Sequence, residues 1–329
     1  MVDDGRDVGA AQYWFSHIFE LGTLDRVNAF ETRPEIRQPA DGRTFVLTLG
    51  CPDRTGIVAA LSGFIAEIGG WITEAAYHSD STSGWFFTRQ AIRADSVPMP
   101  VEEIRERFAA VATRLGPETE WQLTDSGEPK SVVLLVSKDS HCLTDLLSRA
   151  ERGELPARID AVIGNHLDLE LPTTRFGVPF HHVPFPAGDP EGKAAAFAQV
   201  QQLVDAHSPD AIVLARFMQI LPADLCEAWA GRAINIHHSF LPSFIGARPY
   251  HQAFDRGVKL IGATCHYVTA DLDAGPIIEQ DVGRINHEQT PADMVRQGRD
   301  IETLVLSRGV RWHLEDRVLV HGRKTVVFA

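Results

Sequence analysis

The chain has 329 residues, a mass of 36.3 kDa and 31 basic against 44 acidic residues, which gives a formal net charge of −13. This charge would repel the phosphates of nucleic acids, and the 44% apolar and 23% charged residues exclude disorder of the whole chain. The length is typical of two domains, and no apolar run approaches the roughly 20 residues of a membrane-spanning helix. We therefore expect neither a nucleic acid nor a membrane as a partner.

Cysteine usage and the first residues of the chain indicate a reducing compartment. The residues Met1–Asp7 offer neither the basic flank nor the apolar core of a secretory signal. Widely spaced cysteines without a CxxC pair argue against a disulfide framework or a structural zinc site. The four cysteines are Cys51, Cys142, Cys226 and Cys265. We expect a cytoplasmic protein.

Clusters of turn-forming residues divide the chain at Pro39–Gly42 and at Asp125–Lys130. We predict an N-terminal arm over 1–42, a first domain over 43–127 and a second domain over 130–329. The arm could dock on the body or on a neighbouring subunit, or it could be a partly ordered tail.

The first domain reads as strand, helix, strand, strand, helix, strand. Asp53 is a candidate N-cap for the first helix, Gly69 and Gly70 would end it, and Pro100 would open the second helix. This order predicts a ferredoxin-like sheet with two helices on one face. The predicted strands are 44–49, 71–78, 85–92 and 118–123.

The second domain alternates strands with helices, which predicts an α/β fold with a mostly parallel, Rossmann-like sheet covered on both faces. Ligands of such sheets bind at the carboxyl ends of the strands. Thr290, Pro291 and Asp293 form a strong helix start, and that helix should run to about Trp312. The predicted strands are 132–136, 159–164, 180–183, 211–215, 233–237 and 277–280, and the other predicted helices are 143–151, 192–206 and one that begins at Pro222.

The residues richest in chemistry follow the predicted strand 233–237. Asn235 and His237 are two apart, so both side chains lie on one face of that strand. An amide donor and an imidazole aimed at one point suit an oxyanion that develops on a carbonyl. Asp273 stands in a tight loop, where a carboxylate could favour a charged His237 or hold a water molecule. Each piece alone has a structural alternative, since Asp-x-Asp before Gly-Pro is common turn chemistry.

Taken together, these motifs resemble those of the folate-dependent formyltransferases, including the glycinamide ribonucleotide transformylases. The resemblance rests on Asn235-Ile236-His237, on Ser239-x-Leu241-Pro242 and on Asp273-x-Gly275-Pro276-Ile277. The segment Met218–Leu221 resembles the part of those enzymes whose main chain binds the pterin.

A more specific resemblance is to the formyltetrahydrofolate deformylases, which hydrolyse 10-formyltetrahydrofolate to formate and tetrahydrofolate. It implies an ACT regulatory domain before a formyltransferase-like domain, no metal or other cofactor, and a homo-oligomer (dimer or tetramer). It also implies a role in supplying formate for purine synthesis and in balancing the folate pool. The segments that carry the resemblance are Pro52–Val58, Ser137–Leu143, Ile234–Phe240, Gly246–Ala253 and Lys259–Thr264.

The resemblance also implies roles for single residues. Asn235 would polarise the formyl oxygen, His237 would stabilise the oxyanion, and Asp273 would pair with His237 and orient or activate the water. Residues expected at the substrate are Met218, Gln219, Ile220, Leu221, His141, Cys142, Leu143, Ser239 and His251. Methionine or glycine would be the natural effector of the first domain, at Asp53, Gly56, Ile57 and Gly70.

The residues 137–143 bear on whether the formyl group is transferred or hydrolysed. Transformylases bind the phosphate of their acceptor with a glycine-rich loop here, whereas this segment has no glycine, and Asp139 would oppose a phosphate. We expect His141, Cys142 and Leu143 to occupy the lost acceptor site, which leaves water as the nucleophile. Alternatively, this turn only starts a helix.

Other interpretations stay open at this stage. The chain could be a formyltransferase acting on another amine, such as an amino sugar, or a folate or amino-acid sensor without catalysis. Trp71 could fill the effector pocket, which would leave the first domain a purely structural dimerisation module. Arg248 could meet the glutamate tail of folate or be a solvated surface residue. His181, His182, His238 and His251 could suggest a metal site, but no acidic or cysteine partner stands at ligand spacing.

Overall fold

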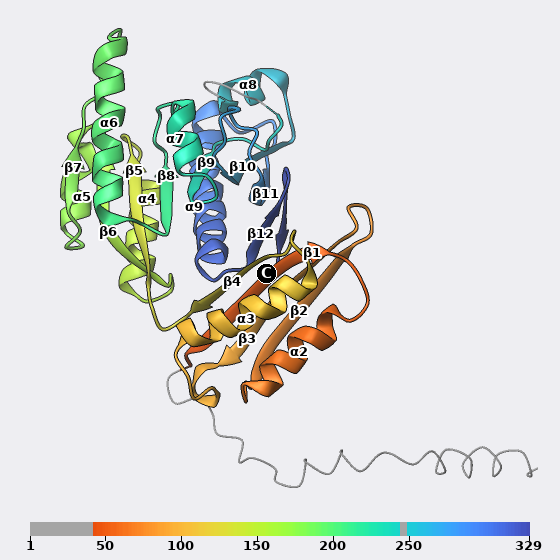
Figure 1. Cartoon of the computed structure of the whole chain (residues 1–329). Helices are drawn as coiled ribbons and strands as arrows, with labels where there is room; N and C mark the ends of the chain where they lie inside the picture. Colours follow the sequence, from red (N-terminus) through yellow and green to blue (C-terminus); the bar gives the residue numbers. More distant parts are fainter. Residues whose placement is uncertain (1–41, 244–248) are drawn as a thin grey trace, which may run out of the picture. The chain divides into compact units, whose positions relative to one another are not determined.

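The computed structural model describes residues 42–243 and 249–329 (Figure 1). The predicted arm, apart from Gly42, lies outside the described residues, as do Arg248 and the start of the segment Gly246–Ala253. Within the described part of the chain, no helix combines the length and the apolar character that crossing a membrane requires.

Residues 44–125 form the predicted four-stranded antiparallel sheet, with strand order β2-β3-β1-β4. Leu47 and Leu49 of β1 pack in one core with Leu61 and Phe108 of the two helices, so the helices cover a single face as expected for a ferredoxin-like fold. The elements are β1 (Thr44–Pro52), α2 (Ile57–Glu67), β2 (Ile72–Asp80), β3 (Trp85–Arg93), η1 (Ala94–Ser96), α3 (Val101–Leu115) and β4 (Glu120–Asp125).

The start of α2 corrects one prediction. Its N-cap is Gly56, with φ +91°, rather than Asp53. Gly56 tolerates this left-handed backbone because it has no Cβ. Asp53 lies three residues before this cap and instead accepts a hydrogen bond from the Ser79 hydroxyl.

The second half forms a seven-stranded sheet of order β11-β10-β9-β8-β5-β6-β7. The five strands from β9 to β7 are parallel, whereas β10 runs antiparallel to β9, and β11 to β10. This confirms the mostly parallel fold. The strands are β5 (Lys130–Val136), β6 (Ala157–Gly164), β7 (Phe180–His182), β8 (Ala211–Ala215), β9 (Ala233–His237), β10 (Leu260–Tyr267) and β11 (Ile277–Arg284).

Helices cover both faces of this sheet. Leu134 of β5 packs in a cluster with Leu146 of α4 and Val305 of α9, whereas the next residue, Leu135, packs with Val200 of α6. Successive side chains of a strand point to opposite faces, which explains the two clusters. The helices are α4 (His141–Glu151), η2 (Leu167–Leu169), α5 (Glu170–Thr174), α6 (Pro190–His207), α7 (Ala223–Ala228), α8 (Pro249–Arg256) and α9 (Pro291–Leu314).

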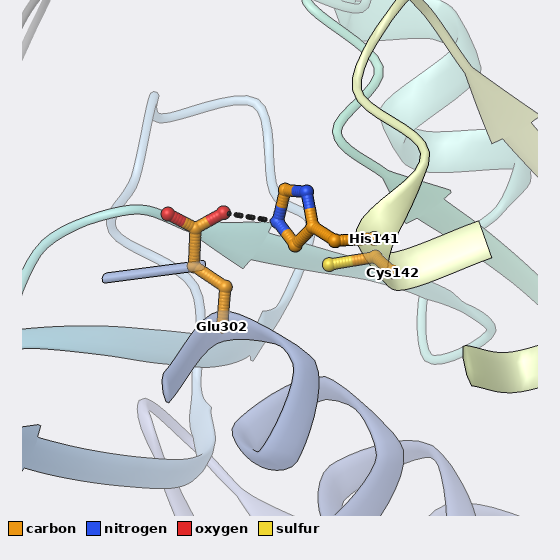
Figure 2. A group of neighbouring side chains, drawn as sticks. All are labelled: His141, Cys142 and Glu302. Carbon is orange, nitrogen blue, oxygen red and sulfur yellow. Dashed lines mark hydrogen bonds and ion pairs between the residues drawn. The ribbon is translucent and has the colours of Figure 1, made fainter. Parts of the chain in front are cut away.

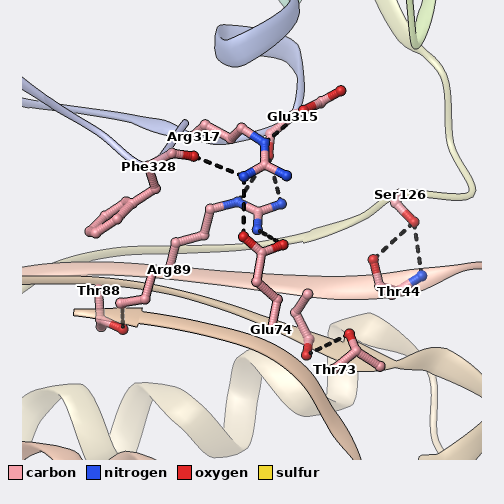
Figure 3. Close-up of polar contacts among 11 residues, drawn as sticks. Thr44, Thr73, Glu74, Thr88, Arg89, Ser126, Glu315, Arg317 and Phe328 are labelled. Carbon is pink, nitrogen blue, oxygen red and sulfur yellow. Dashed lines mark hydrogen bonds and ion pairs between the residues drawn. The ribbon is translucent and has the colours of Figure 1, made fainter. Parts of the chain in front are cut away.

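A C-terminal hairpin, β12 (Val318–His321) and β13 (Lys324–Val327), follows α9 and was not predicted. Around it, Arg89 of β3 donates to the backbone oxygen of Glu315 at 3.2 and 3.1 Å and forms an ion pair with Glu74 at 2.9 Å. Arg317 contacts Glu74 at 3.1 Å and the backbone oxygen of Phe328 at 2.8 Å. These contacts join the first sheet to the end of α9 (Figure 3).

The start of α9 has the predicted capping box, in which the Thr290 hydroxyl accepts from the Asp293 backbone and Asp293 accepts from the Thr290 backbone. Replacing Thr290 with alanine removes half of this arrangement. We expect the free energy of unfolding to fall by about 1 kcal/mol in urea denaturation.

Thr303→Ala is the matched control for this prediction, because Thr303 lies in the interior of the same helix and, among the described residues, its hydroxyl bonds only to the Arg299 backbone oxygen. Equal stability of the two variants would show that the capping box contributes nothing.

Candidate active site

Three side chains meet at the carboxyl edge of the parallel strands. His237 is the last residue of β9, and its Nδ1 lies 3.3 Å from Oδ1 of Asp273 in the loop after β10. Asn235 lies two residues before His237 and pairs across the sheet with His266 of β10. The structure therefore brings the three predicted catalytic residues together, and the strand register explains how.

The loop that carries Asp273 is held against β10. A Cβ on Gly275 would lie 1.8 Å from the backbone oxygen of Tyr267, so this close approach requires glycine. The Tyr267 amide donates to the Pro276 oxygen at 2.9 Å. Asp273 itself has φ +53°, a left-handed conformation that aspartate adopts more readily than most residues. The backbone thus fixes where the carboxylate points.

Asp273 and His237 form a charge-stabilising pair. The hydrogen bond from His237 lowers the pKa of Asp273, and burial only partly opposes this effect. Because the carboxylate is therefore ionised near neutral pH, the proton of the imidazole stays on Nδ1. The other nitrogen, Nε2, is buried and has no hydrogen-bond partner among the described residues. It is the atom available to a substrate.

His266 orients Asn235. Its Nδ1 lies 2.8 Å from the backbone oxygen of Tyr267, which can only accept, so Nδ1 carries a hydrogen. Burial lowers the pKa of His266, which leaves the ring neutral and its Nε2 an acceptor. That Nε2 lies 3.2 Å from Nδ2 of Asn235. One amide hydrogen of Asn235 is thus donated to His266, and the second remains for a substrate oxygen.

These groups face a cavity of about 340 Å³. Asn235, His237 and Asp273 form one part of its lining, together with His266 and His238. The predicted pterin segment forms another part, and all four of its residues line the cavity: Met218, Gln219, Ile220 and Leu221. A volume of this size suits one small organic ligand.

The other predicted substrate residues do not line this cavity. Cys142 and Leu143 are buried in the core cluster of the parallel sheet, and their contact with the substrate stays a prediction. His251 is exposed on α8. Ser239 donates to the Ser243 oxygen and lines a second, largely apolar cavity of about 310 Å³.

The predicted effector residues lie around the start and the end of α2. Asp53 is exposed, whereas Ile57 is buried in the core of the first sheet and so offers no side chain to a ligand. A Cβ on Gly70 would lie 2.8 Å from the Ile65 side chain, so packing requires glycine there. Gly56 is the cap described above.

His141 belongs to a different cluster. Its Nε2 lies 2.9 Å from Oε2 of Glu302, and Figure 2 shows this pair with Cys142 beside it. The potential ligand atoms of these three residues lie within 4.8 Å of one another, the spacing of a metal site. Burial, however, raises the pKa of the Cys142 thiol well above its usual value, so the sulfur is protonated and a poor ligand.

Glu302 is 1% exposed and is surrounded by donors. Tyr250 donates to its Oε1 at 2.6 Å, and Nε of Arg216 lies 3.5 Å from its Oε2. Burial alone would raise the pKa of Glu302, but the hydrogen bonds from His141 and Tyr250 and the charge of Arg216 lower it. Glu302 is therefore ionised, and its charge is already balanced by the protein's own cation.

Sequence reasoning missed His266, Arg216 and Glu302. Glu302 could have been noticed, because a carboxylate stands on the apolar stripe of the predicted helix, between Gly298 and Val305. His266 becomes visible only from the pairing of β9 with β10. Arg216 lies between a predicted strand and the pterin segment Met218–Leu221 but belongs to neither.

Comparison with known proteins first defines the class. The sequence profile of the formyl transferase family matches residues 130–310, which contain the whole cavity lining. A glycinamide ribonucleotide transformylase structure from Symbiobacterium toebii is 30% identical, covers 63% of this chain and 98% of its own, and has a TM-score of 0.58. The second domain is thus a formyl transferase domain.

The relatives that extend over the first domain as well are more specific. Formyltetrahydrofolate deformylases from Mycobacterium tuberculosis and Bacillus subtilis are 46% and 44% identical, each over 86% of this chain and over 90% and 93% of their own lengths. A crystal structure of a formyltetrahydrofolate deformylase from Pseudomonas syringae pv. tomato is 51% identical, covers 97% of this chain and 99% of its own, and has a TM-score of 0.84. The chain belongs to the formyltetrahydrofolate deformylase family.

The buried charge of Glu302 leads to a stability prediction. Glu302→Gln removes the buried carboxylate that lies 3.5 Å from Arg216, and we expect the free energy of unfolding at pH 7 to fall by about 3 kcal/mol. Since the pKa of Glu302 is lowered in the folded state, its stabilising contribution is present above its ordinary pKa and is lost as the pH falls through the folded value. The variant should therefore lose less stability on acidification than the wild type.

Asp300→Asn is the matched control, because Asp300 is exposed on the same helix, two residues earlier. Urea denaturation at pH 7 and below measures both variants. Similar unfolding free energies for the two would mean that Glu302 is not a stabilising ion-pair partner.

Proposed function

We propose that this chain hydrolyses 10-formyltetrahydrofolate to formate and tetrahydrofolate. The single observation that supports this best is one cavity that holds both the pterin segment Met218–Leu221 and the group Asn235, His237 and Asp273. Membership of the deformylase family supports hydrolysis over transfer. The alternative, a formyltransferase acting on an amine, is not favoured, because the transformylase structure covers only 63% of this chain, whereas the deformylase structure covers 97%.

The proposed reaction begins when water adds to the formyl carbon. The negative charge that develops on the formyl oxygen would be stabilised by the Asn235 amide and by Nε2 of His237. Asp273, ionised and paired with His237, supports a positive charge on the imidazole or orients the water. The bond from the formyl carbon to N10 then breaks, N10 gains one proton, and formate leaves with release of the second proton of the water.

We also propose that the enzyme needs no metal or other cofactor. His141 and Glu302 satisfy one another, and Arg216 places a positive charge 3.5 Å from the carboxylate. A metal cation in this group would be repelled by that charge and would meet a protonated thiol.

For the remaining parts, we propose a cytoplasmic enzyme made of an arm over 1–42, an ACT regulatory domain over 43–127 and the catalytic domain over 130–329. It would supply formate for purine synthesis and bind methionine or glycine as an effector. Strand β2 lies at the edge of its sheet, and Tyr77 and Trp71 are exposed on and beside it. An open strand edge of this kind supports a homo-oligomer, a dimer or a tetramer.

Asp273→Asn tests the proposed chemistry. It keeps the size of the side chain and removes the charge that supports the His237 imidazolium, so we expect formate release from 10-formyltetrahydrofolate to fall by about 10²–10⁴-fold. The measurement is formate production without any added acceptor.

Asp271→Asn provides the control, since it makes the same charge change at an exposed position of the same loop. Unchanged activity in Asp273→Asn, or an equal loss in both variants, would contradict the role of Asp273. Absence of formate release from the wild type would overturn the proposed function itself.

Chelation tests the absence of a metal requirement. Dialysis against EDTA should leave the rate of formate release unchanged, and zinc added afterwards should not raise it. A loss of activity that zinc or another divalent ion restores would place a metal in the mechanism.

A further inference from the structure

One wall of the catalytic cavity is formed by a charged side chain to which neither the family motifs nor the proposed mechanism gives a role. Arg216 follows β8 directly, lines the cavity together with His237 and His238, and its side chain is 13% exposed. Its Nη2 donates to Asp139 at 3.0 Å, and its Nε lies 3.5 Å from Glu302. The guanidinium is therefore held between two carboxylates at the edge of the site.

Arg216 is backed by the buried side chain of Glu302. Glu302 is fully buried there and is fixed by Tyr250 at 2.6 Å and by His141 at 2.9 Å. Burial opposes the charge of Arg216, but Glu302 and Asp139 outweigh it and raise its pKa. At Arg216 the cavity therefore meets a cluster of buried, ionised side chains.

The charges of this cluster also balance. Asp139 accepts from Arg299 at 3.1 Å as well as from Arg216, so two arginines face the two carboxylates of Asp139 and Glu302. An anionic group of a second substrate would find no excess positive charge here. A phosphate site needs such an excess, or backbone amides that are free to donate.

Arg216 holds this position against the preference of its backbone. Its φ is +64°, a left-handed conformation that arginine rarely adopts. Such outliers persist where the surrounding structure enforces them, and they cluster at functional sites. At Arg216 the unusual backbone and the two ion pairs occur together, at the edge of the cavity.

We propose that Arg216, fixed by Glu302 and Asp139, is a specificity-determining residue that closes the cavity to an amine acceptor and so reserves the formyl carbon for water. This inference rests on the proposed deformylase function. A transfer would need an amine nitrogen about 3 Å from the formyl carbon. Water is small enough to reach that carbon past the closed wall, whereas an amine carried on a larger molecule is not.

The sequence-based hypothesis assigned this closure to His141, Cys142 and Leu143. In the structure, Cys142 and Leu143 belong to the core, and His141 contacts Glu302 and does not line the cavity. Of the residues in this cluster, Arg216 is the one that lines the cavity.

Removing the guanidinium tests the proposal. Arg216→Ala opens the wall, and the probe is glycinamide added with 10-formyltetrahydrofolate. In the transfer, the amine nitrogen bonds to the formyl carbon, the bond from that carbon to N10 breaks, and one proton passes from the amine to N10. Mass spectrometry measures the ratio of formylglycinamide to formate. We expect this ratio to exceed that of the wild type by about tenfold or more. Even one methylene group in a pocket changes the discrimination between substrates by about this factor, and Arg216→Ala removes a larger group.

Arg216→Met is the matched control, because it removes the charge and keeps most of the volume. Its ratio should stay near that of the wild type. If Arg216→Ala does not fold, the double variant Arg216→Ala with Glu302→Gln leaves no unpaired buried charge and should show the same raised ratio.

An unchanged ratio in the folded alanine variant, or an equal rise in Arg216→Met, would overturn the proposal. Failure of the proposed function gives a different result, since the wild type would then release no formate at all.

Discussion

The antiparallel pairing of β10 with β9 is the constraint on which the site depends. The strands β9, β8, β5, β6 and β7 are parallel, whereas β10 runs antiparallel to β9. Its register places His266 opposite Asn235 and Thr264 opposite His237. The chain that leaves β10 then turns immediately, since Gly275 packs against the Tyr267 backbone, and this turn delivers Asp273 to His237.

Ionised groups around the cavity are paired within the protein. Asp273 lies 3.3 Å from His237 and Glu302 lies 3.5 Å from Arg216, while burial lowers the pKa of His238 to about 4 and keeps that ring neutral. Paired charges in a protected site act more strongly on a developing oxyanion than they would in water. The same pairing leaves no surplus charge to attract an anionic second substrate, which is consistent with hydrolysis.

Helix α9 connects the two halves of the described chain. Near its middle it carries Glu302, and just beyond its end the backbone of Glu315 accepts from Arg89 of the first sheet (Figure 3). Arg317 and Glu74 extend this contact. The polar cluster beside the cavity and the contact with the four-stranded sheet thus share one rigid element of 24 residues.

The sequence by itself determined most of the elements and identified the three side chains that meet at the edge of the sheet. Alternation and capping signals are local, so β8, β9 and the Thr290 cap were predicted at their observed positions, and Asn235 with His237 followed from the period of a strand. Only the tertiary structure decided which residues surround them. Arg216, His266 and Glu302 come from three separate elements, and nothing local to any of them shows that they converge. For the same reason the sequence could not show that Cys142 and Leu143 lie in the core, since whether a helix residue faces the core or the cavity is set by what packs against that helix.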